Sequence, residues 1–203
     1  MRKLSKNYIQ TRHIVLDLET ASTATNAAIV SIGMVQILRH DAAYVTEISQ
    51  ASFYTELGIP HQLCRGLITD PSTKAFWDTI SALPRRIYDT ALSDFADPTD
   101  QLWRAVEWIE NIAKATGEDP VVWGNSPSFD CRILEHALCV YGIEVPWKFR
   151  NERDVRTASH LFKVPIEKTR PTTPHHALAD ATAEAHTLIA INQSLPETMS
   201  LFL

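Results

Sequence analysis

Residues 13–20 read His13-Ile14-Val15-Leu16-Asp17-Leu18-Glu19-Thr20, an apolar run that ends in two acidic residues. The Ile, Val and Leu content predicts a β-strand. Since side chains alternate between the two faces of a strand, Asp17 and Glu19 are predicted to project together from one face. Two crowded carboxylates repel each other unless a cation lies between them, and a hard divalent cation with oxygen ligands is the usual partner. Taken alone, the pair also fits a solvated strand end.

Further strands and helices are predicted on both sides of this acidic strand. The strands fall at 28–38, 44–54 and 120–123, and the helices at 98–116, 128–140, 155–162 and from just after Pro174 to about Ile191. Strands first, followed by strands that alternate with helices, predict an α/β fold with a mixed sheet covered by helices. No repeat or linker-like run divides the chain, so we expect a single domain over residues 1–203 with its core at about 12–192.

The composition excludes several classes of protein. The chain has 203 residues, of which 45% are hydrophobic and 21% charged. A chain of this length and composition can bury a stable hydrophobic core without disulfide bonds or structural metal ions. No apolar run approaches the roughly 18 residues of a membrane helix, and the run 14–16 is too short for a secretion signal, so we expect a cytoplasmic protein with no membrane partner. The three cysteines form no Cys-x-x-Cys pair, which argues against a disulfide framework or a cysteine-based zinc site.

Two further acidic residues lie at the starts of predicted helices. Asp130 falls in the first turn of the predicted helix that follows Trp123-Gly124. A carboxylate at this position is either part of a functional site or simply stabilises the helix by a favourable interaction with its dipole. Asp180 lies on a helix face otherwise made of alanines, so its side chain is predicted to point inward. Because an unpaired buried carboxylate is costly, a cation or a hydrogen-bond donor is expected to meet it.

Three motifs, in this order, resemble those of the DEDDh, or DnaQ-like, 3′–5′ exonucleases. They are Asp17-x-Glu19, Asn125-x-x-x-Phe129-Asp130 and His175-x-Ala177-Leu178-x-Asp180-Ala181. Other stretches are similar to one branch, the small bacterial and phage exonucleases related to the mycobacterial 3′–5′ exoribonuclease and phage exodeoxyribonuclease A: Asp70-Pro71-Ser72-Thr73 with Phe76-Trp77, residues 146–151, and Arg153-Asp154-Val155-Arg156-Thr157. The resemblance implies an RNase H-like fold with a mixed five-stranded sheet flanked by helices.

The same resemblance implies hydrolysis of single-stranded RNA or DNA from the 3′ end, with release of nucleoside 5′-monophosphates. Two Mg²⁺ or Mn²⁺ ions about 3.5–4 Å apart would stabilise the attacking and the leaving oxygen. By similarity, Asp17 holds both ions, Glu19 and Asp180 hold the ion on the nucleophile side, and Asp130 holds the ion on the leaving-group side. His175 is then the general base that takes a proton from the attacking water.

His176 competes with His175 for the role of base, because His176 and Asp180 are four residues apart and share a helix face. The family spacing fits His175, so we expect His176 at the surface or behind the site. Residues implied to contact the terminal nucleotide are Leu18, Thr20, Asn125 and Phe129.

The charge of the chain is unevenly distributed. The net charge is −5, yet seven Lys or Arg face three acidic residues between Lys148 and Arg170. An exonuclease must hold a polyanion near an acidic site, so the residues predicted to contact phosphates are Arg150, Arg153, Arg156 and Lys163. Arg153 is equally suited to pair with Asp154 or Glu152, and an ordinary solvated surface is the alternative for the whole stretch.

Two other function classes fit the same fold. A catalytically silent module for nucleic-acid binding or protein interaction would be expected to lack at least one of the four carboxylates or His175, and all five residues are present. An RNase H-like endonuclease is disfavoured because a histidine five residues before the last aspartate matches the exonuclease pattern. The sequence is also compatible with a homodimer.

Overall fold

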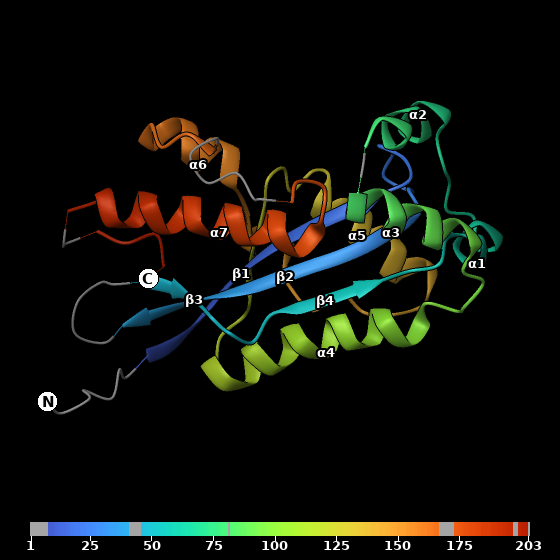
Figure 1. Ribbon diagram of the computed structural model, residues 1–203. Helices are drawn as coiled ribbons and strands as arrows, with labels where there is room; N and C mark the ends of the chain where they lie inside the picture. The colour runs from blue at the N-terminus through green and yellow to red at the C-terminus, as the bar shows by residue number, and fades with distance from the viewer. Residues whose placement is uncertain (1–7, 41–45, 81, 167–172, 197–198, 203) are drawn as a thin grey trace, which may run out of the picture.

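The computed structural model of the protein describes residues 8–40, 46–80, 82–166, 173–196 and 199–202 (Figure 1). Its strands are β1 (Tyr8–Thr20), β2 (Ile29–His40), β3 (Thr46–Ile48), β4 (Phe53–Glu56), β5 (Val121–Gly124) and β6 (Glu152–Asp154). Its helices are α1 (Ile59–Cys64), α2 (Pro71–Thr79), α3 (Ala82–Ser93), α4 (Thr99–Thr116), α5 (Asp130–Val140), α6 (Val155–Phe162) and α7 (Ala177–Ser194), with a short 3-10 turn, η1 (Phe149–Asn151).

The strands form one mixed sheet in the order β3-β2-β1-β5-β6. The long strands β1 and β2 are antiparallel, whereas β5 runs parallel to both β1 and β6. Both β3 and β4 pair antiparallel with β2, at residues 37–39 and 31–34 respectively, so they follow one another along the same edge. The described strands therefore occupy five positions, which confirms the predicted mixed five-stranded sheet.

The region 44–93 differs from its prediction. The single strand expected at 44–54 is two short strands, because the chain turns between them, where Ser52 N–H donates to the Gln50 carbonyl. Residues 44 and 45 lie outside the described part of the chain. The helices α1, α2 and α3 were not predicted. The first two are short and bury few side chains, whereas α3 does carry an apolar stripe, formed by Pro84, Ile87, Tyr88 and Ala91, that the prediction missed.

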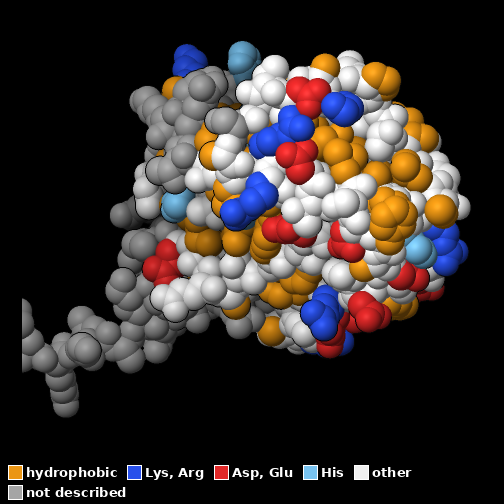
Figure 2. Space-filling view, turned by 45° about the vertical axis from the view of Figure 1, so that its right-hand side comes forward, with side chains coloured by type: hydrophobic (Ala, Val, Ile, Leu, Met, Phe, Trp, Pro, Cys, Tyr) orange, Lys and Arg blue, Asp and Glu red, His pale blue; other side chains and the backbone are white. Residues whose placement is uncertain are grey.

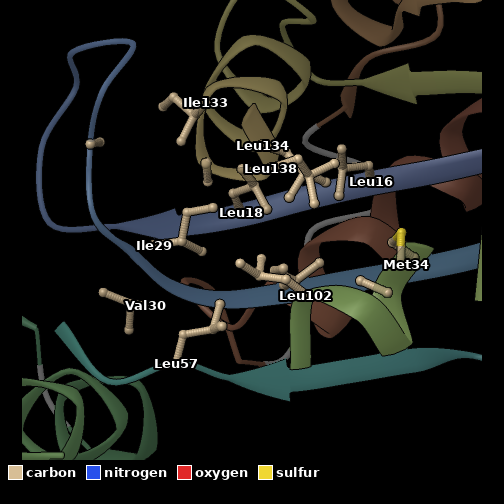
Figure 3. Close-up of a cluster of buried hydrophobic side chains, with 14 of the residues drawn as sticks. Leu16, Leu18, Ile29, Val30, Met34, Leu57, Leu102, Ile133, Leu134 and Leu138 are labelled. Atoms are coloured by element: carbon tan, nitrogen blue, oxygen red, sulfur yellow. The ribbon is translucent and has the colours of Figure 1, made fainter. Parts of the chain in front are cut away.

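The two faces of the sheet bury separate apolar clusters. Ile14, Leu16 and Leu18 of β1 pack with residues of α4 and α5 (Figure 3), whereas Val15 packs with α6 and α7 on the other face. Figure 1 shows α4 and α7 on opposite sides of the sheet. Strand alternation therefore places Asp17 and Glu19 on the face of Val15, the face that α7 covers.

The helices α1, α2 and α3 lie together beyond one end of the sheet (Figure 1). Figure 2 shows hydrophobic side chains gathered on the surface there, and the exposed ones include Leu63, Phe76 and Phe95. No helix in the described ranges combines the length and apolar character that crossing a membrane requires.

Candidate active site

The carboxylates of Asp17, Glu19 and Asp180 meet where β1 ends beneath the start of α7. One oxygen from each lies within 4.8 Å of the others, and all three side chains are partly buried. Gly33 of β2 is the register partner of Asp17, so no side chain from the neighbouring strand covers this part of the sheet. The structure thus brings together two residues that are two positions apart in the sequence and a third that is far from them.

Asp130 approaches the same strand from the side of β5. Because β5 ends at Gly124, the N–H of Leu18 has no strand partner there and donates to Asp130 Oδ1 at 3.2 Å. Asp130 is only 3% exposed, and Oδ2 accepts from the Ser126 N–H at 3.4 Å. A Cβ atom on Gly124 would lie 3.0 Å from Asp130 Oδ2, so any larger residue at the end of β5 would crowd this carboxylate.

The environment of these carboxylates disfavours their charged forms. Burial, reinforced by the neighbouring Asp180 and Asp130, raises the pKa of Glu19 to about 8. Burial also raises the pKa of Asp130 to about 7, against the backbone hydrogen bonds that lower it. The pKa values of Asp17 and Asp180 are raised for the same main reason. A divalent cation would offset both the burial and the mutual repulsion.

The residues present fit such a cation. Asp17 Oδ2 is buried and has no hydrogen-bond partner among the described residues. Carboxylate oxygens are the ligands that Mg²⁺ and Mn²⁺ prefer. The donor set of Asp17, Glu19 and Asp180, with Asp130 beside it, therefore suits hard divalent cations.

The two consecutive histidines face different neighbours. His175 has a positive φ of 63° and its ring meets Phe76 edge-on at 5.0 Å between centroids. His176 is the residue before α7, and its ring stacks on Tyr54 at 4.6 Å. The His176 N–H donates to Asp180 Oδ2 at 3.1 Å. His175 thus turns towards α2, whereas His176 packs against β4 and is half-buried.

A pocket of about 310 Å³ adjoins the carboxylates. Its lining residues come from the end of β1, from α2 and from the start of α5: Leu18, Glu19, Thr20, Thr23, Ser72, Thr73, Phe76, Trp77 and Phe129. The pocket therefore contains three of the four predicted nucleotide contacts, the exception being Asn125.

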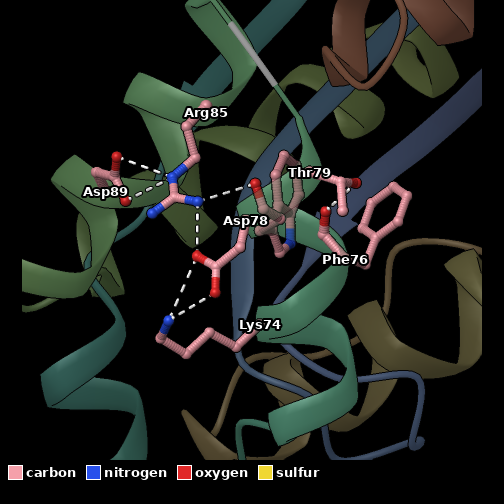
Figure 4. Close-up of polar contacts among 7 residues, drawn as sticks. Lys74, Phe76, Asp78, Thr79, Arg85 and Asp89 are labelled. Atoms are coloured by element: carbon pink, nitrogen blue, oxygen red, sulfur yellow. Dashed lines mark hydrogen bonds and ion pairs between the residues drawn. The ribbon is translucent and has the colours of Figure 1, made fainter.

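The wall of the pocket formed by α2 is fixed to β1. Trp77 is 2% exposed, and its Nε1–H donates to the Thr20 carbonyl at 2.9 Å. On the other side of α2, Arg85 of α3 donates to the Trp77 carbonyl at 3.0 Å and pairs with both Asp78 and Asp89 (Figure 4). These contacts hold the exposed ring of Phe76 beside His175.

Arg156 reaches the site from α6. Its Nε–H donates to Asn125 Oδ1 at 3.1 Å, so the predicted residue Asn125 holds an arginine rather than lining the pocket. The charge of Arg156 also counters the raised pKa of Asp130. Arg156 lines an open groove of about 590 Å³ together with Ser159, His160, Lys163, Pro165 and Ile166.

Arg150 and Arg153 are not among the residues that line the groove along α6. Arg153 NH1 donates to the carbonyls of Arg150 at 2.7 Å and Glu152 at 2.9 Å, so its described partners are neither of the carboxylates considered from the sequence. The carboxylate of Glu152 binds Arg132 instead, and that of Asp154 caps α6. Within the described ranges, no contact brings Arg150 or Arg153 to the acidic cluster. Lys168 and Arg170, which add to the predicted basic stretch, lie outside the described residues.

Sequence reasoning missed two residues at this site. Phe76 was not among the predicted site residues, yet it is 42% exposed and lines the pocket. Glu184 was not considered, although it follows Asp180 by one helical turn and is only 4% exposed. Its spacing of four residues from Asp180, on a helix face rich in alanine, is the signal that was available.

Comparison with known proteins identifies the family and the fold of the chain. The family model described as "3′-5′ exoribonuclease Rv2179c-like domain" matches residues 12–192. The nuclease domain of 3′hExo, a DEDDh family member bound to rAMP, is similar in structure with a TM-score of 0.57, 14% identity and coverage of 93% of each chain. The Mg²⁺- and Mn²⁺-bound form of S. pombe Pop2p has a TM-score of 0.48 and 10% identity over 91% of this chain and 84% of that chain. No curated protein matches.

The similarity to the 3′hExo nuclease domain confirms the RNase H-like fold of the DEDDh nucleases. The family model spans all three acidic motifs and nearly the whole described core. On this match, the chain is a member of the Rv2179c-like family of 3′–5′ exoribonuclease domains.

Proposed function

We propose that this protein removes nucleotides one at a time from the 3′ end of single-stranded RNA and releases nucleoside 5′-monophosphates. The observation that carries this proposal is the convergence of the Asp17, Glu19 and Asp180 carboxylates within 4.8 Å beside a pocket that can hold a nucleoside. The family description favours RNA over the DNA that the sequence also allowed. The cytoplasmic location and the homodimer remain predictions from the sequence.

Each acidic residue has a role in this proposal. Asp17, Glu19 and Asp180 would hold one divalent cation, and Asp17 and Asp130 would hold a second. When bound, two Mg²⁺ or Mn²⁺ ions supply charge stabilisation for the attacking and the leaving oxygen of the phosphodiester. Because Asp130 is fixed by the N–H groups of Leu18 and Ser126, its carboxylate is already oriented before substrate binds.

The pocket would take the terminal nucleoside. The apolar side chains of Leu18, Phe76 and Phe129 offer surfaces against which a base can pack, and Thr20, Ser72 and Thr73 offer polar groups at the same site. His175 lies against Phe76 at the rim of this pocket, where an imidazole nitrogen would accept the proton of the attacking water.

The part of the RNA upstream of its terminal nucleotide would run along α6. Arg156, His160 and Lys163 occupy positions i, i+4 and i+7 of this helix and its C-cap, so they share one side of it. They line the groove of about 590 Å³ that begins next to Asn125. Successive phosphates placed along this groove would meet positive charge immediately outside the acidic site.

The test uses RNA and DNA oligonucleotides of matched sequence, labelled at the 5′ end, with free or blocked 3′ ends. We expect a ladder of shortened RNA only when the 3′ end is free and Mg²⁺ or Mn²⁺ is present, with no products in EDTA. Asp17→Asn is expected to abolish turnover, whereas Asp100→Asn, the same charge change at an exposed position of α4, serves as the matched control. Cleavage of blocked oligonucleotides, or wild-type turnover in Asp17→Asn, would contradict the proposal. Binding without hydrolysis would favour the catalytically silent module.

A further inference from the structure

Glu184 is a fifth carboxylate at the acidic site, and the roles assigned above do not use it. It lies on α7 one turn after Asp180, which places both side chains on the same side of the helix. Glu184 is 4% exposed, and its Oε2 atom has no hydrogen-bond partner in the part of the chain that the structure describes. An acidic side chain buried in this way is costly unless something positive meets it.

The charged groups that act on Glu184 are mostly other acids. Its charge acts on Asp17 more strongly than those of Asp130, Glu19 and Asp180 do. Asp17 Oδ2 is also buried and has no hydrogen-bond partner among the described residues. The acidic site therefore contains two buried carboxylate oxygens without a hydrogen-bond partner, one on Asp17 and one on Glu184. Among the described residues, a cation that acts on Glu184 is Arg156, whose guanidinium is hydrogen-bonded to Asn125.

Glu184 is not one of the three carboxylates whose oxygens converge within 4.8 Å. We therefore treat Glu184 as a buried neighbour of these three carboxylates rather than as a member of their group. In a buried position its negative charge is poorly screened by water, so it adds to the attraction that Asp17 exerts on a divalent cation. Its free oxygen is also suited to accept a hydrogen bond from a water molecule of the ion's hydration shell.

We propose that Glu184 is a positioning residue of the metal site: as a buried neighbour of Asp17, it strengthens the binding of the divalent cation. This inference rests on the proposed function, because it assumes that the acidic cluster binds Mg²⁺ or Mn²⁺. Groups that support metal ligands from outside the coordination shell typically contribute about 10–100-fold to metal affinity. Glu184 is expected to contribute within this range.

The test measures Mn²⁺ binding by calorimetry, in the full chain and without nucleic acid. Glu184→Gln removes the charge and keeps the shape, so we expect the Kd for Mn²⁺ to rise by about 10–100-fold. Glu107→Gln is the matched control, since Glu107 is exposed on α4 at the opposite face of the sheet, and its Kd should equal that of the wild type. The melting temperature in EDTA should rise in Glu184→Gln, because one member of a repelling cluster is gone.

A purely structural role for Glu184 predicts the opposite pattern, with a lower melting temperature and an unchanged Kd. An unchanged Kd in folded Glu184→Gln overturns the inference. If the amide at this buried position prevents folding, Glu184→Met removes the charge without adding an unpaired polar group, and the same criterion applies to it. A wild-type protein that neither binds Mn²⁺ nor hydrolyses RNA would overturn the proposed function itself. Wild-type binding and hydrolysis with unaltered variants would overturn only the role of Glu184.

Discussion

Gly33 and Ala177 are in backbone contact: a Cβ atom on Gly33 would lie 2.2 Å from the carbonyl carbon of Ala177. The first residue of α7 therefore lies directly on β2, at the residue that pairs with Asp17. This approach brings Asp180, three residues further along α7, to the carboxylates of β1. The absence of one side chain thus sets the distance between the two halves of the acidic site.

Gly33→Ala is expected to push the start of α7 away from the sheet. Overpacking of this kind costs about 1–3 kcal/mol of folding stability, and we expect a loss of turnover larger than that stability change alone explains. Gly66→Ala is the control, because Gly66 has a φ of +91° and open space around it, so alanine there strains the backbone without moving α7. Melting temperature and kcat measured for both variants separate the two effects. Equal loss of activity in both would contradict this account of Gly33.

The metal-free protein is expected to lose stability as the pH rises from about 6.5 to 8.5. The folded state keeps a proton on Glu19 up to a pKa of about 8 and on Asp130 up to about 7, whereas the unfolded chain has released both. The folded state therefore binds more protons, and the free energy of unfolding falls with rising pH. The buried His13 has its pKa lowered to about 3, so between about pH 3 and 6.5 it makes the free energy of unfolding rise with pH. The pH window of the experiment therefore begins at 6.5.

Urea unfolding in EDTA across this window measures the slope. Mn²⁺ should remove the loss, because a cation binds the ionised carboxylates of the folded state. Glu19→Gln should flatten the slope in EDTA. A metal-free protein whose stability is constant or rises over the window would show that the carboxylates are not held in a charge-disfavouring site.

His175→Ala is expected to lower kcat by on the order of 10²–10⁴-fold, the usual effect of losing a general base. His176→Ala should stay within about tenfold, because its ring packs on Tyr54 and its contribution to the site is a backbone N–H that alanine retains. Single-turnover rates at saturating RNA measure both effects. A larger loss of kcat in His176→Ala than in His175→Ala would assign the proton transfer to His176.

Arg156→Ala is expected to raise KM for RNA and to reduce the dependence of binding on salt by about 0.7 in log–log slope, the value for one phosphate contact on a single strand. Lys163→Ala should behave similarly, since it lines the same groove. Arg153→Ala is the internal control, because its guanidinium is held by two backbone carbonyls. Binding titrations at several salt concentrations give the slopes, and equal slopes for Arg153→Ala and Arg156→Ala would contradict the assigned path.

The sequence predicted those parts of the site that depend on local periodicity. The shared face of Asp17 and Glu19 follows from strand alternation, and the inward direction of Asp180 follows from the alanine face of its helix. The partners of Arg153 were not predictable in the same way, because they are carbonyl groups whose positions depend on the turn at η1. The place of Phe76 in the pocket was not predicted, because its exposure depends on how α2 packs against β1 and α3. Long-range packing, rather than residue type, determines these features.

Because side chains of β1 alternate between the two faces of the sheet, the number of residues between Val15 and Asp17 determines which face the acidic pair occupies. One inserted residue between Val15 and Asp17 would turn both carboxylates towards the α4 and α5 side of the sheet, while the apolar content of the strand would hardly change. Such a protein would still contain an Asp-x-Glu pair after an apolar run, yet its metal ligands would be buried in the wrong core. Among active relatives, we therefore expect a constant number of residues between the acidic pair and the buried apolar residue before it, with insertions confined to the connections between elements.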